Sequence, residues 1–164
     1  MLDLVGIRYY AYPVAAELAD IAECSPRDFI SSDPLMDAWG PQEERPPMLY
    51  LDKCWRNLQV VLGPRGTEKA RVAYELVRGE VTMRADGWDA FVRYLEPTTV
   101  GSIAGDLAAV DECQVMDGVA ELRRQRPIDD YASEVDYTLE YLSAAVGFTT
   151  DLARQGKGLV YLIG

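Results

Sequence analysis

Asp52, Lys53, Trp55 and Arg56 form the densest group of residues in the sequence that could act on a ligand. Asp52 is well placed as the N-cap of a helix that continues to residue 62. Free N–H groups and the positive end of the helix dipole favour an anion there. One interpretation is therefore a small anionic ligand held by Lys53 and Arg56 against Trp55. The commoner arrangement is that Asp52 caps the helix, Trp55 packs in the core and the two cations cover the surface.

Cys54 lies between Lys53 and Arg56, an environment that lowers the pKa of a thiol. No general base is identifiable nearby, and a free cysteine is usually a small core residue, so we expect an inert thiol. The sequence contains no histidine, which removes Ser-His-Asp and Cys-His nucleophile systems and histidine zinc sites. We accordingly assign no catalytic residue, no metal ligand and no cofactor.

Arg93 and Tyr94 are further candidates for the same ligand site, provided that the fold brings them to Trp55. Tyrosine is unusually common, with ten residues beside three phenylalanines. It tolerates half-burial, so it suits cleft walls, protein interfaces and homodimer contacts. Amphipathic packing of strands and helices explains the same abundance without any partner.

The net charge of -11 bears on possible partners. Its average field repels nucleic acid and anionic membranes, and it attracts a basic protein. Residues 129–140 contain five carboxylates and no cation, which fits a docking face for such a partner. The alternative is a solvated helix start, because the helix dipole favours acidic residues at that end.

The elements that must position these residues indicate an α+β fold with a small mixed sheet packed against several helices. We expect strands near residues 4–12, 49–51, 91–95 and 158–163, and helices from 13, 53, 97 and 116. Pro13 is expected to end the first strand, and residues 67–78 to be helical, with 71–77 alternatively a strand. The longest helix should cover residues 134–155, and Gly156 should cap it. The final strand is apolar on both faces, which favours a central position in the sheet.

Length and composition favour a single domain over residues 1–164. No apolar run is long enough to span a membrane, and the first residues lack the features of a signal peptide. The three cysteines Cys24, Cys54 and Cys113 have no paired spacing, which is typical of reduced thiols. We therefore expect a cytoplasmic protein.

The order of several short motifs resembles the YfbM-like family of uncharacterised bacterial proteins, a domain of unknown function. The motifs are Leu51-Asp52-Lys53 with Trp55, Arg93-Tyr94-Leu95 before a helix, and the long acidic helix followed by Leu159-Val160-Tyr161-Leu162. The resemblance implies one α+β domain and carries over no catalytic residue. The chain departs from the family at Arg56 and Gln59, where relatives often carry histidines, and at Ala90-Phe91, where a Gly-Pro is common.

These observations favour a cytosolic binding or interaction protein that does not catalyse a reaction. One concrete form is an inhibitor or immunity-type partner of a basic protein. The alternative is a binding protein or enzyme for a small anionic ligand, with its site around Trp55, Lys53 and Arg93.

Overall fold

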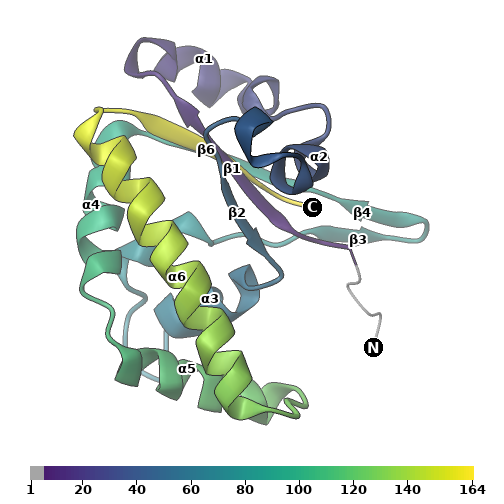
Figure 1. The fold of residues 1–164 in the computed structure, drawn as a ribbon, viewed down its shortest axis with the longest axis vertical. Coiled ribbons are helices and arrows are strands. Elements are labelled where there is room, and N and C mark those ends of the chain that lie inside the picture. Colours follow the sequence, from purple (N-terminus) through teal and green to yellow (C-terminus); the bar gives the residue numbers. More distant parts are fainter. Residues whose placement is uncertain (1–5) are drawn as a thin grey trace.

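The computed structural model describes residues 6–164 and contains a four-stranded sheet in the order β2-β1-β6-β5 (Figure 1). Its strands are β1 (Tyr9–Val14), β2 (Leu49–Asp52), β5 (Phe91–Leu95) and β6 (Gly158–Ile163). The α+β class is confirmed, with the difference that every ladder of this sheet is antiparallel rather than mixed. The final strand lies inside the sheet, between β1 and β5, as its two apolar faces predict.

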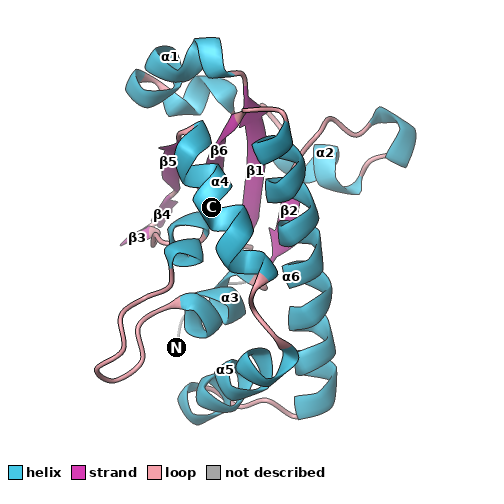
Figure 2. Ribbon diagram, turned by 90° about the vertical axis from the view of Figure 1, so that its left-hand side faces the viewer, coloured by secondary structure: helices cyan, strands magenta, loops and turns pink. Residues whose placement is uncertain are grey.

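One face of the sheet carries the main core. It is covered by α3 (Trp55–Leu62), α4 (Pro97–Ala108), α5 (Glu112–Gln125), α6 (Tyr131–Arg154) and the 3-10 turn η4 (Val72–Leu76). Figure 2 shows α4 and α6 crossing in front of the strands, with α3 and α5 at one end of them. Tyr9, Leu58, Ile103 and Tyr161 are among the fully buried residues that join the sheet to these helices. No helix in residues 6–164 has the length and apolarity that crossing a membrane requires.

The opposite face of the sheet is covered by the segment between β1 and β2. It contains the short elements η1 (Ala16–Leu18), α1 (Ala19–Cys24), η2 (Pro26–Phe29), α2 (Pro34–Trp39) and η3 (Gln42–Glu44). Tyr10, Tyr12 and Ala38 form one small buried cluster there, and Val14, Ala22 and Val160 form another. The hairpin β3 (Thr82–Arg84) and β4 (Gly87–Asp89) is a separate two-stranded sheet that projects from the body (Figure 1).

The helix ends follow ordinary capping chemistry. Asp111 and Gln114 form a capping box at the start of α5, and the Asp130 side chain accepts from the Ser133 amide at the start of α6. The long helix therefore begins at Tyr131, three residues before its predicted start. Gly156 follows it with a φ of 62°, the left-handed conformation that glycine adopts without strain.

Three local expectations differ from the structure. Pro13 lies within β1 instead of ending it. The pairing of β1 with β2 has already ended at this point, and β1 continues to pair with β6. The predicted helix over 67–78 is only the 3-10 turn η4, so residues 71–77 are neither an α-helix nor a strand. Asp52 is not an N-cap, because it ends β2 and Cys54 precedes α3. Leu4 and Val5, at the start of the predicted first strand, lie outside the described residues.

Candidate functional site

A hollow of about 490 Å³ lies beside Trp55, between α3, α5 and the segment that enters the β3–β4 hairpin. We call it the Trp55 hollow. The residues that line it are Trp55, Arg56, Gln59, Val60, Glu80, Val81, Met83, Leu122, Gln125 and Arg126. Its wall therefore combines an indole, two guanidinium groups and one carboxylate with several aliphatic side chains. Such a mixture of apolar surface and a few convergent polar groups is typical of small-molecule sites.

Trp55 is the residue of this hollow whose hydrogen bonding is incomplete. Only 2% of its surface is exposed, and its indole Nε1 has no acceptor among the described residues. A buried donor without an acceptor costs about 1–3 kcal/mol. The Arg56 guanidinium lies 5.1 Å from the centroid of the indole ring, within the range of a cation–π contact. The indole and the guanidinium are therefore packed together in one wall of the hollow.

The charge of the hollow is locally positive. Arg56 has no carboxylate within 4 Å among residues 6–164. Desolvation and the neighbouring Arg126 lower the pKa of Arg56, and Glu80 acts in the opposite direction. Two cations and one anion in the lining give a formal charge of one positive unit, in a chain whose net charge is -11. Arg126 is paired with Glu134, so Arg56 is the guanidinium of the lining that has no carboxylate partner among the described residues.

A buried polar network fixes Arg126 at the rim. Its Nη2 donates to Glu134 Oε1 at 2.7 Å and to Asn57 Oδ1 at 3.2 Å. The Asn57 amide in turn donates to Glu134 Oε1 at 2.8 Å and to Thr138 Oγ1 at 2.9 Å. Such a network orders the guanidinium before any ligand arrives, which lowers the entropy cost of binding.

Gln59 anchors the opposite wall of the hollow. Its Nε2 donates to the carbonyl oxygens of Val77 at 2.7 Å and Gly79 at 2.8 Å. These two bonds fix the chain that leads into the hairpin, and Val81 and Met83 of that chain line the hollow. Sequence reasoning missed Gln59, Asn57 and Arg126 as parts of a site.

The predicted residues around Trp55 separate into different places. Trp55 and Arg56 line the hollow, whereas Lys53 is exposed and Asp52 contacts other partners. Cys54 is fully buried, and burial, together with Glu134, raises the pKa of its thiol well above the usual range. The flanking cations therefore do not produce an activated thiolate.

Arg93 and Tyr94 do not reach the hollow. They are consecutive residues of β5, so their side chains lie on opposite faces of the sheet. Arg93 Nη1 pairs with Glu75 Oε2 at 2.6 Å on the main-core side. Tyr94 packs with the small cluster around Val160 on the other side, and its hydroxyl has no partner in the described chain.

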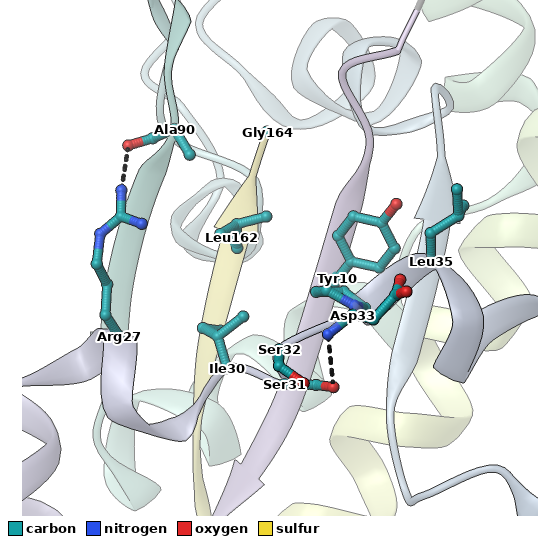
Figure 3. Close-up of a pocket in the computed structure, with 11 residues that line it drawn as sticks. Tyr10, Arg27, Ile30, Ser31, Ser32, Asp33, Leu35, Ala90, Leu162 and Gly164 are labelled. Atoms are coloured by element: carbon teal, nitrogen blue, oxygen red, sulfur yellow. Dashed lines mark hydrogen bonds between the residues drawn. The ribbon is translucent and has the colours of Figure 1, made fainter.

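A second hollow of about 380 Å³ lies on the outer face of the sheet. Figure 3 shows Tyr10 and Leu162 on its strands, with Arg27 and Asp33 at opposite ends. Both charged residues have local structural roles. Arg27 Nη2 donates to the Ala90 carbonyl oxygen at 3.5 Å, and the Asp33 side chain caps α2 by accepting from the Met36 amide. The Trp55 hollow is the stronger candidate, because its indole donor and Arg56 have no such partners.

The chain belongs to the family described as Domain of unknown function (DUF1877), whose model matches residues 14–162. Among solved structures it is similar to that of YfbM from Escherichia coli, described as a protein of unknown function. The two are 15% identical with a TM-score of 0.58, over 96% of this chain and 99% of that chain. At this identity the likeness shows the fold alone. No curated protein matches the chain. The YfbM-like resemblance is thus confirmed.

Proposed function

We propose that this protein binds a small organic monoanion in the Trp55 hollow. The observation that carries the proposal is a guanidinium without a carboxylate partner that lies over a buried indole in the wall of the hollow. The buried indole N–H of Trp55 has no acceptor, and Arg56, stacked on the same ring, has no carboxylate partner among residues 6–164. A carboxylate or a similar oxyanion in the hollow supplies a partner for Arg56.

The lining also indicates the kind of anion. Guanidinium groups match carboxylates in a planar, two-pronged geometry, and a single guanidinium without a carboxylate partner, that of Arg56, suits one negative charge better than two. Val60, Val81, Met83 and Leu122 offer apolar contacts to the remainder of the ligand. A carboxylate attached to a compact apolar or aromatic body satisfies both requirements.

Binding without turnover is the form of the proposal that the neighbouring groups support. Glu134 already accepts hydrogen bonds from Arg126 and Asn57, and Cys54 is buried with a raised thiol pKa. Neither is therefore free to act as a general base or a nucleophile on a ligand in the hollow, and Glu80, the carboxylate of the lining, interacts with the charge of Arg56. The role we propose is recognition of a metabolite, with no chemical step.

Calorimetric titration with benzoate, and with the neutral benzamide as matched control, tests the proposal. Benzoate is expected to bind one molecule per chain with a Kd of roughly 1 mM or tighter, which corresponds to about 4 kcal/mol or more. Benzamide should bind at least about tenfold more weakly, because it offers no charge to the guanidinium groups. Equal binding of the two compounds, or no heat from benzoate, would overturn the proposal.

A further inference from the structure

A second feature of the molecule, separate from the Trp55 hollow, is the surface beside the edge strand β2. Met36 and Trp39 lie three residues apart on α2, with 62% and 61% of their surface exposed. These are the largest exposures among the bulky apolar residues of the described chain. Water-exposed apolar side chains that gather in one place mark interaction sites more often than single ones do.

Trp39 is exposed, and it is also held in place from two directions. Its Nε1 donates to the Tyr50 hydroxyl at 3.2 Å, and the Arg8 guanidinium lies 5.4 Å from the centroid of its ring. Arg8 Nε and the Tyr50 hydroxyl both donate to Asp52 Oδ1, at 3.1 and 2.9 Å. A large aromatic side chain fixed in this way loses little conformational entropy when a partner covers it.

The same carboxylate links this surface to α6. The Tyr137 hydroxyl donates to Asp52 Oδ2 at 3.0 Å, and the Tyr137 and Tyr141 rings meet edge to face at 5.0 Å. Asp52 has a φ of 48°, a left-handed conformation that a non-glycine residue adopts at some cost. That conformation places its carboxylate where Arg8, Tyr50 and Tyr137 all reach it.

We propose that the surface formed by Met36, Trp39, Arg8, Tyr50, Tyr137 and Tyr141, here called the Trp39 surface, docks a basic segment of another protein through an apolar anchor. Its residue types, Trp, Tyr and Arg, are those that carry most of the binding energy in protein interfaces. The positive charge of Arg8 is already balanced by Asp52.

The charges near the Trp39 surface indicate which kind of partner binds there. Asp136 and Glu140 are exposed on α6, next in sequence to Tyr137 and Tyr141. A segment rich in Lys or Arg is attracted to this rim. A second copy of the chain would instead bring together two molecules of net charge -11. Charge therefore favours a basic partner over a second copy of the chain as the occupant.

Selection of short random peptides displayed on phage against the purified protein tests this inference. Enriched peptides should carry net positive charge and at least one bulky apolar residue. Their affinity should fall roughly tenfold or more in Trp39→Ser, and it should also fall in about 0.5 M NaCl. Ile21→Ser on α1 changes an apolar residue outside this surface that is 55% exposed, and it should leave affinity unchanged.

Trp39→Phe keeps an aromatic ring but loses part of the indole's area and the bond to Tyr50, so it should bind with intermediate affinity and serve as a folded reference. Three outcomes would overturn the inference: no enrichment, enrichment of neutral or acidic peptides, or equal binding by Trp39→Ser. Sedimentation that shows a dimer, dispersed by Trp39→Ser, would also overturn it by assigning the surface to a second copy. None of these measurements depends on the Trp55 hollow.

Discussion

Replacing Arg56 with Gln is expected to weaken benzoate binding by about 10- to 100-fold, which is the worth of one charge-assisted hydrogen bond of roughly 1.5–3 kcal/mol. The same change should lower the free energy of unfolding by no more than about 1 kcal/mol, because Arg56 is exposed and has no carboxylate partner among the described residues, and an exposed cation–π contact is worth about 0.5–1 kcal/mol. Calorimetric titration gives the affinity, and urea denaturation gives the stability.

Arg123→Gln is the matched control for that change. Arg123 is an exposed residue of α5 that does not line the hollow, and its replacement removes the same single positive charge. Its benzoate affinity should stay within about twofold of the unchanged protein, since exposed charges at a distance are screened by salt. If both variants lose affinity equally, the attraction comes from the net charge of the chain and not from the Trp55 hollow.

Replacing Asp52 with Ala is expected to lower the free energy of unfolding by about 3 kcal/mol. Three side-chain donors, from Arg8, Tyr50 and Tyr137, lose their acceptor, and alanine tolerates the φ of 48° poorly. Asp52→Asn keeps an acceptor oxygen and a residue type that accepts left-handed φ, so it should cost about half as much. Urea denaturation at neutral pH measures both. Equal stability of Asp52→Ala and the unchanged protein would contradict this account of the network.

The pH dependence of stability gives the same network a second test. Burial alone would raise the pKa of Asp52, but hydrogen bonds from Tyr50, Tyr137 and the Lys53 amide, with the charge of Arg8, outweigh it and leave that pKa lowered. The stabilisation is therefore complete above the unfolded value of about 3.9 and is lost as the pH falls through the lower folded value. Asp52→Asn should lose less stability than the unchanged protein in this acidic range. Parallel curves would show that the carboxylate is not specifically stabilised.

Some of the candidate site could be predicted because it is local. Trp55 and Arg56 are consecutive in one short helix, so their proximity follows from the sequence alone. Arg126 and Glu134 come from α5 and α6, and tertiary packing places them beside Asn57. Sequence periodicity does not predict which residues of different helices meet. Asn57 is nevertheless buried, and a buried asparagine needs polar partners.

The placement of Arg93 and Tyr94 on opposite faces of the sheet could be predicted from the sequence. Residues 91–95 were correctly predicted as a strand, and successive side chains of a strand point to opposite faces. The two residues could not line one pocket together. The Asp52 prediction failed for a different reason, because a short polar residue before a helix also fits a strand end with left-handed φ.

The segment around residue 75 illustrates how tertiary contacts override local propensity. Its pattern fits a helix, yet it forms only η4. The Tyr9 hydroxyl donates to the Leu76 carbonyl oxygen at 2.9 Å, and the Tyr161 hydroxyl donates to that of Glu75 at 3.2 Å. These bonds satisfy backbone acceptors that would otherwise need another turn of helix. The sequence therefore predicted the sheet and the long helices better than this connection.

The most direct test of the proposed site follows the three tryptophan indole N–H signals by NMR during a benzoate titration. The Trp55 signal is predicted to shift when an anion binds to Arg56, whose guanidinium lies over the Trp55 ring, and the Trp39 and Trp88 signals should stay in place. The same titration of Arg56→Gln should leave the Trp55 signal unmoved at the same benzoate concentration. A Trp55 signal that does not shift in the unchanged protein, whether or not benzoate binds elsewhere, would contradict the assignment of the Trp55 hollow as an anion site.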